Sequence, residues 1–302
     1  MTRHIQLLVL ALISGFLPPF SSMVGAAPIP PEVKAVVAFL FAQKSDTEMV
    51  PWGTAFFVGV KHPKQPERSF VYLVTAKHVL QTPDRKSWLP KIFIRLNRHD
   101  GGSDLLELPI VISGKGQTTF VHPDPTVDLA VIPAVPDEKV IDFKFLPDDM
   151  ITTKEDFRNL RIVEGSEVFF TGLFSPYIGT RRNYPVVRFG RVALITEEKI
   201  KFGDREAELY LIKSGAYGGN SGAPVFFYLG SEREPGVIFA GPPIVKLAGV
   251  ISGTFLDMQP VRAVETATVP VAPSNMGIAG VVPAYKLYEL LFASELKALR
   301  EK

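Results

Sequence analysis

Cysteine is absent from the 302-residue chain. Without thiols the protein forms no disulfide bond, and it has neither a thiolate metal site nor a cysteine nucleophile. A chain of this length buries enough apolar surface to fold into one or two domains without such cross-links. The hydrophobic core alone must therefore hold the fold together.

A strong excess of one charge sign is also missing. Lys and Arg total 33 against 31 Asp and Glu, which leaves a formal net charge of +2. Nucleic-acid-binding proteins usually concentrate positive charge, so we expect no nucleic-acid partner. The chain is 46% hydrophobic and 21% charged, which excludes a disordered polyelectrolyte. Its 24 Gly and 26 Pro residues favour many turns between short strands.

The N-terminal apolar run, residues 5–17, is too short for a transmembrane helix, which needs about 20 residues. Arg3 precedes this run and small residues from Val24 to Ala27 follow it, which is the layout of a secretory signal peptide. We therefore expect residues 1–26 to be a signal peptide and the mature protein to be exported, to a bacterial periplasm or the medium. No stable membrane anchor is expected after cleavage. An uncleaved anchor is the alternative.

Short strand-like segments separated by turn residues, and not by long helices, make up most of the remaining chain. The first group comprises residues 36–41, 53–60, 70–75, 91–96, 105–112 and 128–132. The second comprises residues 167–172, 186–195, 209–212, 224–229, 246–254 and 277–282. This pattern predicts two antiparallel β-barrels or sandwiches in tandem and argues against an alternating βαβ sheet.

The boundary between the two groups is expected near residue 150. Thr152 with Glu155 three residues later predicts a capping box and a short helix there. The domains are then 27–150 and 151–282. Residues 259–275 show no periodicity and predict a loop. Residues 283–302 have apolar side chains at helical spacing, which predicts a C-terminal helix docked on its own domain. A partner-binding or membrane-surface helix is the alternative.

His78 is the histidine with the most suggestive context, because it follows the apolar segment from Tyr72 to Thr75 at a strand end. A lone histidine is usually structural. Ser221 lies in Gly218-Gly219-Asn220-Ser221-Gly222, where glycines let backbone N–H groups converge beside the hydroxyl. A simple polar turn is the alternative. Asp128 begins an apolar strand, where a carboxylate needs a partner, whereas Asp124 is more simply a turn-former.

Other chemistries lack their signatures. All five histidines precede Ser221, so the Ser-Asp-His order of an α/β-hydrolase cannot be assembled. The sequence has no His-Glu-x-x-His motif, no phosphate-binding Gly-x-x-x-x-Gly-Lys loop and no dinucleotide-binding Gly-x-Gly-x-x-Gly loop. We therefore expect neither a metal nor a cofactor.

Taken together, three motifs resemble the trypsin/chymotrypsin-like serine peptidases, in particular the cysteine-free bacterial trypsin-like and HtrA-like branch. They are Thr75-Ala76-Lys77-His78-Val79, Asp128-Leu129-Ala130-Val131 and Gly219-Asn220-Ser221-Gly222-Ala223-Pro224. The resemblance runs from about Gly53 to Pro283. Each motif alone is weak, but their order and spacing agree. Too few residues follow Pro283 for the PDZ domain that HtrA-like members usually carry, so none is expected.

The resemblance implies an all-β fold of two six-stranded antiparallel barrels, followed here by the C-terminal helix. It implies Ser221 as nucleophile, His78 as general base and Asp128 as the group that orients the imidazole. The N–H groups of Gly219 and Ser221 would form the oxyanion hole. Asn220 replaces the aspartate that pairs with a new N-terminus in animal members, so we expect no such activation switch.

The same resemblance places a primary pocket for the substrate side chain. Its walls would be Gly215, Ala216 and Tyr217 on one side and Ser252, Gly253 and Thr254 on the other. None of these residues is acidic, so a small or apolar side chain is the expected preference. The predicted protein is an exported serine endopeptidase acting on proteins or peptides, with no indication of its oligomeric state. The alternatives are an inactive barrel that binds peptides as a scaffold and an esterase.

Overall fold

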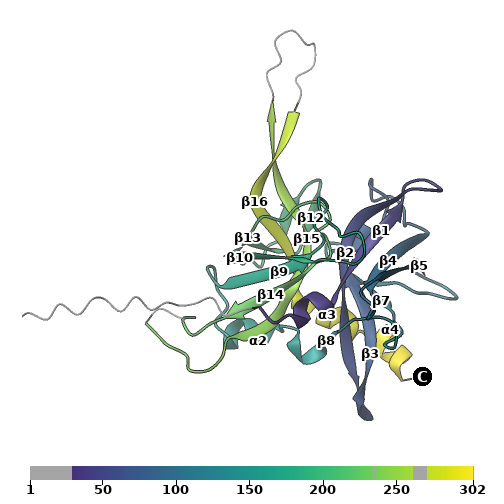
Figure 1. Ribbon diagram of the computed structural model, residues 1–302. Coiled ribbons are helices and arrows are strands. Elements are labelled where there is room, and N and C mark those ends of the chain that lie inside the picture. Colours follow the sequence, from purple (N-terminus) through teal and green to yellow (C-terminus); the bar gives the residue numbers. More distant parts are fainter. Residues whose placement is uncertain (1–28, 234–235, 261–270, 302) are drawn as a thin grey trace, which may run out of the picture. The chain divides into compact units, whose positions relative to one another are not determined.

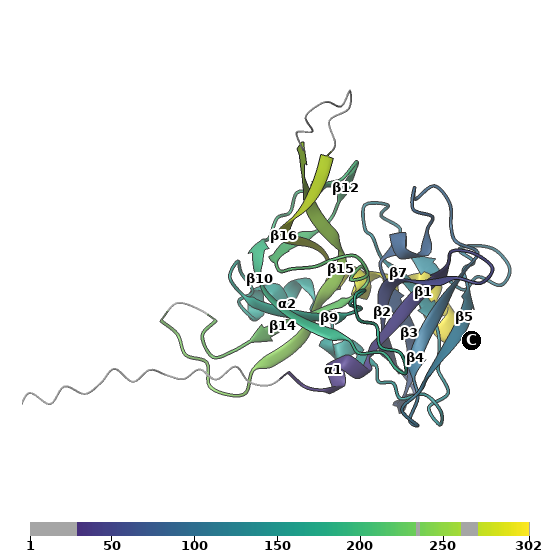
Figure 2. The same cartoon turned by 45° about the horizontal axis from the view of Figure 1, so that its top comes forward.

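The computed structural model describes residues 29–233, 236–260 and 271–301 (Figure 1). The expected signal peptide, residues 1–26, lies outside the described residues. From Pro31 onward the chain forms one compact unit. Strands dominate this unit, and Figure 2 shows a first sheet beside a barrel with few helices. The all-β class predicted from the sequence is confirmed.

The first sheet has eight strands in the order β5-β4-β1-β2-β3-β7-β6, with β8 paired to β2. The strands are β1 Val37–Gln43, β2 Met49–His62, β3 Gln65–Thr75, β4 Lys91–Asn97, β5 Ser103–Pro109, β6 Phe120–Val121, β7 Ala130–Pro133 and β8 Leu146–Pro147. The sequence predicted six strands here. The two it missed, β6 and β8, are two residues long and too short for a period-2 pattern. Apolar side chains from β1 to β4 and β7 form one buried cluster that includes Phe57, Leu73 and Ile92.

The second half forms the expected six-stranded antiparallel barrel, which is closed in the order β10-β13-β16-β15-β14-β9. Its strands are β9 Glu167–Gly172, β10 Val186–Leu194, β13 Tyr210–Lys213, β14 Pro224–Leu229, β15 Ile244–Pro260 and β16 Val271–Pro283. Predicted and observed bounds agree at β9 and β14. A separate two-stranded hairpin, β11 Ile200–Phe202 and β12 Arg205–Ala207, had not been predicted.

Within the segment 259–275, which was expected to be a loop, the residues that the structure describes, 259–260 and 271–275, lie in strands. β15 extends to Pro260 and β16 begins at Val271, and the two pair over this stretch, from Leu256↔Asn275 to Pro260↔Val271. The prediction was wrong because ladder hydrogen bonds join backbones and require no alternation of apolar side chains. Residues 261–270 lie outside the described part of the chain.

Short helices lie before or between the strands along the chain: α1 Glu32–Ala35, the 3₁₀ helices η1 Lys77–Leu80 and η2 Asp148–Met150, and α2 Lys154–Asn159. The capping box of α2 lies one residue later than predicted, on Thr153 and Asp156. Thr152 cannot serve as the cap, because it is buried and its backbone N–H donates to Leu247 O at 3.1 Å. Thr152 is thus fixed against β15, and the next residue starts the helix.

The C-terminal segment forms two helices, α3 Ala284–Leu291 and α4 Ser294–Arg300. The predicted single helix is interrupted at Ala293, which has extended backbone with ψ 151°. After this break α4 reaches the first sheet, where Arg300 donates to the hydroxyl of Tyr72 in β3 at 3.0 Å. The segment therefore contacts both halves of the unit, and not its own barrel alone. None of the helices described is long and apolar enough to cross a membrane.

Candidate active site

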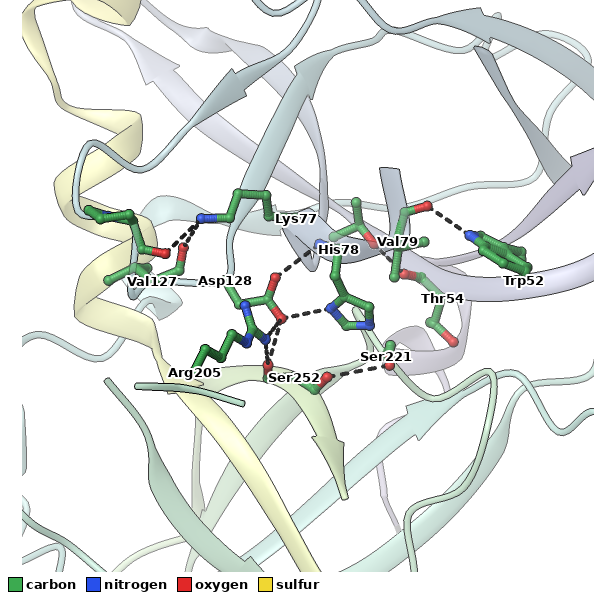
Figure 3. Close-up of polar contacts among 12 residues, drawn as sticks. Trp52, Thr54, Lys77, His78, Val79, Val127, Asp128, Arg205, Ser221 and Ser252 are labelled. Atoms are coloured by element: carbon green, nitrogen blue, oxygen red, sulfur yellow. Dashed lines mark hydrogen bonds and ion pairs between the residues drawn. The ribbon is translucent and has the colours of Figure 1, made fainter. Parts of the chain in front are cut away.

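Strand pairing brings His78 and Asp128 together. β3 ends at Thr75 and pairs with β7 so that Thr75 faces Ala130. The chain then turns into η1 after β3, while Asp128 immediately precedes β7. As a result, His78 Nδ1 lies 2.7 Å from Asp128 Oδ2, and the backbone N–H of His78 donates to Asp128 Oδ1 at 2.9 Å (Figure 3). The carboxylate thus fixes both the imidazole and the backbone that carries it.

Asp128 is completely buried. Its Oδ2 also accepts the Ser252 hydroxyl at 2.6 Å and Arg205 Nη2 at 3.0 Å. Burial alone would raise the pKa of this carboxyl, but His78, Arg205 and the Ser252 hydroxyl together hold that pKa well below its ordinary value. Asp128 is therefore ionised at neutral pH.

Ser221 lies on the turn between β13 and β14, and Figure 3 shows it on the other side of the imidazole from Asp128. Its hydroxyl donates to Ser252 O at 3.4 Å. Within the described part of the chain no hydrogen bond joins this hydroxyl to His78. The serine must turn from Ser252 toward the ring before it can pass a proton to His78. Loose contacts of this kind are common in catalytic sites without substrate.

The turn before Ser221 presents two backbone N–H groups to the site. The carbonyl of Gly218 accepts Ser175 Oγ at 3.0 Å, and that of Asn220 accepts the N–H of Ala223 at 2.9 Å. A trans peptide directs its C=O and N–H to opposite sides. The N–H groups of Gly219 and Ser221 therefore point in the opposite direction to the carbonyls of Gly218 and Asn220. Neither donates a hydrogen bond to any described residue. They are free to bind an anionic oxygen.

The turn fits only glycine at two positions. Gly219 and Gly222 have φ of 91° and 87°, in the left-handed region that side chains disfavour. A Cβ at Gly222 would also collide with the carbonyl of Thr54 and the hydroxyl of Thr75. The turn of the second barrel is thus pressed directly against β2 and β3 of the first sheet.

Asn220 is buried and its amide is fully engaged. Its Nδ2 donates to Leu173 O at 2.6 Å, and its Oδ1 accepts the N–H of Tyr217 at 2.8 Å. Both partners are neutral backbone groups. The side chain therefore holds the turn through hydrogen bonds to neutral groups.

The residues expected to wall the primary pocket have different surroundings. Ala216 is buried and its carbonyl accepts Asn275 Nδ2 at 2.6 Å. Tyr217 is 54% exposed, with the guanidinium of Arg188 4.9 Å from its ring centre. The Ser252 hydroxyl is turned to Asp128, while its carbonyl oxygen accepts the Ser221 hydroxyl. The backbone of Gly253 lies against the ring of Phe202.

Gly215 and Thr254 are only partly buried. A cavity of about 220 Å³ lies beside His78 and is lined by Trp52, His78, Val79, Thr82, Pro83 and Arg85. Among the described residues, no group of three His, Cys, Asp or Glu side chains is arranged to bind a metal ion.

Sequence reasoning missed two residues at this site. Thr54 of β2 accepts the N–H of Leu173 at 3.0 Å and donates its hydroxyl to Gly219 O at 2.7 Å. Arg205 of β12 forms an ion pair with Asp128 across 77 positions of sequence. Neither belongs to a recognisable motif. Lys77, next to His78 in the chain, donates to the carbonyls of Pro125 and Val127 at 3.0 and 3.1 Å.

Comparison with known proteins gives structural neighbours only. No protein-family model matches the sequence, and no curated protein is significantly similar to it. The MamO protease domain from Magnetospirillum magneticum is 18% identical, with a TM-score of 0.46 over 86% of this chain and 97% of that one. The Rv3671c protease in its inactive form is 16% identical, with a TM-score of 0.40 over 86% and 88%. A serine-to-alanine variant of Rv3671c from M. tuberculosis is 14% identical, with a TM-score of 0.41 over 89% of each chain.

Proposed function

We propose that this protein is a serine endopeptidase that cleaves proteins or peptides through an acyl-enzyme. The observation that supports it best is the 2.7 Å contact between His78 Nδ1 and buried Asp128, with Ser221 across the ring. Ser221 Oγ attacks the scissile carbonyl carbon as its proton passes to His78 Nε2. Asp128 holds the ring so that Nε2 is the free nitrogen, and it stabilises the imidazolium that forms.

The tetrahedral intermediate carries its negative charge on the former carbonyl oxygen. The N–H groups of Gly219 and Ser221 bind that oxygen, because their own peptides are held by Ser175 and Ala223. Collapse of the intermediate breaks the C–N bond, and His78 returns its proton to the leaving amine. Water then repeats the sequence on the ester, releasing the acid and the free Ser221 hydroxyl.

We propose a small or apolar side chain at the cleaved position. Ala216 is apolar, and none of the residues predicted to wall the pocket is acidic. The nearby cation, Arg188, lies over the ring of Tyr217. A buried Lys or Arg side chain without a counter-ion would lose several kcal/mol of solvation on binding. In a peptide library, Ala, Val and Leu should lead at this position, and a preference for Arg, Lys or Glu would contradict the assignment.

Export is the second part of the proposal, and it rests on the signal-like pattern of residues 1–26. The mature chain then begins at Ala27 and acts in a bacterial periplasm or in the medium. Sequencing the N-terminus of protein recovered from the envelope tests this. Recovery of Met1 would contradict cleavage.

One observation favours a non-catalytic peptide-binding module instead, namely the contact of the Ser221 hydroxyl with Ser252 O and not with His78. Labelling with a fluorophosphonate, followed by mapping of the modified peptide, separates the two functions. An active peptidase is labelled at Ser221, and the label is lost in both Ser221→Ala and His78→Ala. Ser45→Ala, which alters an exposed serine near the β1–β2 turn, serves as the control and keeps the label. A folded protein that takes no label is the module.

A further inference from the structure

The carboxylate of Asp128 has one partner more than its place beside His78 requires. Its Oδ1 accepts the backbone N–H of His78, and its Oδ2 accepts both His78 Nδ1 and the Ser252 hydroxyl. These contacts already orient the imidazole. The additional partner is Arg205, whose Nη2 donates to the same Oδ2 at 3.0 Å and lies 3.5 Å from Ser252 Oγ (Figure 3).

Arg205 is held in place for this contact. Its side chain is only 21% exposed, and its Nε is buried with no partner among the described residues. The charge-assisted hydrogen bond to Asp128 is the strong interaction that this guanidinium makes. The hairpin that carries Arg205 is itself anchored beside the site, since the ring of Phe202 lies 4.9 Å from that of Phe255.

We propose that Arg205 is a positioning residue, which locks the Asp128 carboxylate and extends to lower pH the range in which His78 acts as a base. This role rests on the proposed peptidase function. A cation beside a carboxylate offsets part of its negative charge. The imidazolium that forms on His78 therefore gains less from Asp128, and the neutral, proton-accepting ring persists into more acidic solution.

Other charged groups face the same carboxylate. Lys77 of η1 and Arg85 of the following loop lie within electrostatic range, and burial lowers the pKa of both side chains. Asp124 and Asp204 partly offset these cations. Arg205 is the only one of the cations to donate a hydrogen bond to Asp128 within the described chain. Among these cations, Arg205 should therefore have the largest effect on the pH range in which His78 accepts a proton.

The test compares pH profiles of kcat/KM for the wild type, Arg205→Gln and Arg205→Lys. In Arg205→Gln the acidic limb should move to higher pH by about one unit, which lowers kcat/KM on that limb about tenfold. Arg205→Lys keeps the charge, so its limb should return toward that of the wild type. Arg85→Gln should move the limb much less, and Lys201→Gln, on the exposed face of the same hairpin, should leave the profile unchanged.

A second measurement does not need hydrolysis. In the Ser221→Ala background, NMR follows the titration of the His78 ring with and without Arg205→Gln. A midpoint that moves to higher pH in Arg205→Gln supports the role of Arg205. This result would stand even if the protein hydrolysed no peptide, so the failure of the proposed function and the failure of this role are distinguishable. An unchanged midpoint, or a limb that moves equally in Arg205→Lys and Arg205→Gln, overturns it.

Discussion

Thr54 of the first sheet donates its backbone N–H to the carbonyl of Ser221 in the second barrel at 2.9 Å. Its hydroxyl donates to Gly219 O and accepts from the N–H of Leu173. One completely buried threonine thus fixes both ends of the tripeptide Gly219-Asn220-Ser221, which carries the candidate nucleophile and the candidate oxyanion hole. The position of Ser221 is set as much by β2 as by its own barrel.

Replacing Thr54 by Val removes the hydroxyl but keeps the shape. Leu173 N–H and Gly219 O then lose their partner in a buried site, so the free energy of unfolding should fall by about 1 to 3 kcal/mol. The kcat should fall by a larger factor than KM rises, because the Gly219 N–H is no longer held in position to bind the oxyanion of the tetrahedral intermediate. Denaturant unfolding and steady-state kinetics measure both. Thr196→Val, which is remote from the site, should change neither; unchanged kcat in Thr54→Val would refute the positioning.

Gly222 should tolerate no side chain. In Gly222→Ala the added methyl group meets Thr54 and Thr75 while the backbone stays at positive φ, so stability should fall by roughly 2 to 6 kcal/mol. Gly218→Ala, four positions earlier, is the matched control, because nothing lies within 4 Å of its added Cβ. Thermal unfolding compares the two. Equal melting temperatures would show that the turn is not pressed against the first sheet.

Removal of Ser221 or His78 should abolish most peptide hydrolysis without unfolding the protein. The nucleophile and its base act as a unit, so the double variant Ser221→Ala/His78→Ala should be little slower than either single variant. Rates with a chromogenic peptide and circular dichroism of all three variants check this. Losses that multiply in the double variant would show that the two side chains act independently.

The turn at Asp124 should make stability depend on pH in the acidic range. The hydroxyl and N–H of Thr126, with a smaller contribution from Lys199, lower the pKa of Asp124 to about 2 from its ordinary 3.8. A lowered pKa in the folded state means that the ionised carboxyl stabilises the fold above about pH 4. This contribution is lost as the pH falls toward 2.

Asp124→Asn keeps an acceptor oxygen but has no charge. Its melting temperature should therefore lie below that of the wild type at pH 7, and the difference should shrink as the pH falls from 5 to 2.5. Asp46→Asn, an exposed carboxyl in the β1–β2 turn, controls for net charge. A gap that stays constant with pH would mean that the Asp124 pKa is not lowered by folding.

The strands that the sequence predicted best are the buried ones with dense apolar residues, such as β9 and β14, where bounds agree to the residue. The pairing of β15 with β16 beyond Leu256 escaped prediction because its bonds are made by the backbone. The break at Ala293 lies within continuous apolar spacing, so periodicity could not show it. The cap of α2 moved because tertiary pairing had already engaged Thr152.

At the site, motif spacing predicted His78, Asp128 and Ser221, each next to a predicted strand, and the structure brings His78 and Asp128 into hydrogen-bond contact. Their catalytic roles stay predictions. Motif spacing did not predict that the Ser252 hydroxyl turns to Asp128. It could not reveal Arg205, because only the folding of β12 beside the carboxylate creates that contact. Local patterns thus predicted the candidate reacting groups, whereas the side chains that contact them depend on tertiary structure.

The closure of the second barrel by β16 has a consequence for biosynthesis. The strand order requires β16, which ends at Pro283, to pair with β13 and β15 before the barrel is complete. Ser252 and the turn at Ser221 are held by these same strands. A nascent chain therefore contains its first sheet and His78, Asp128 and Ser221 well before β16 completes the second barrel. Under the proposed function, peptidase activity appears only once β16 has been synthesised and the barrel is closed, so the unfinished chain cannot cleave the proteins around it.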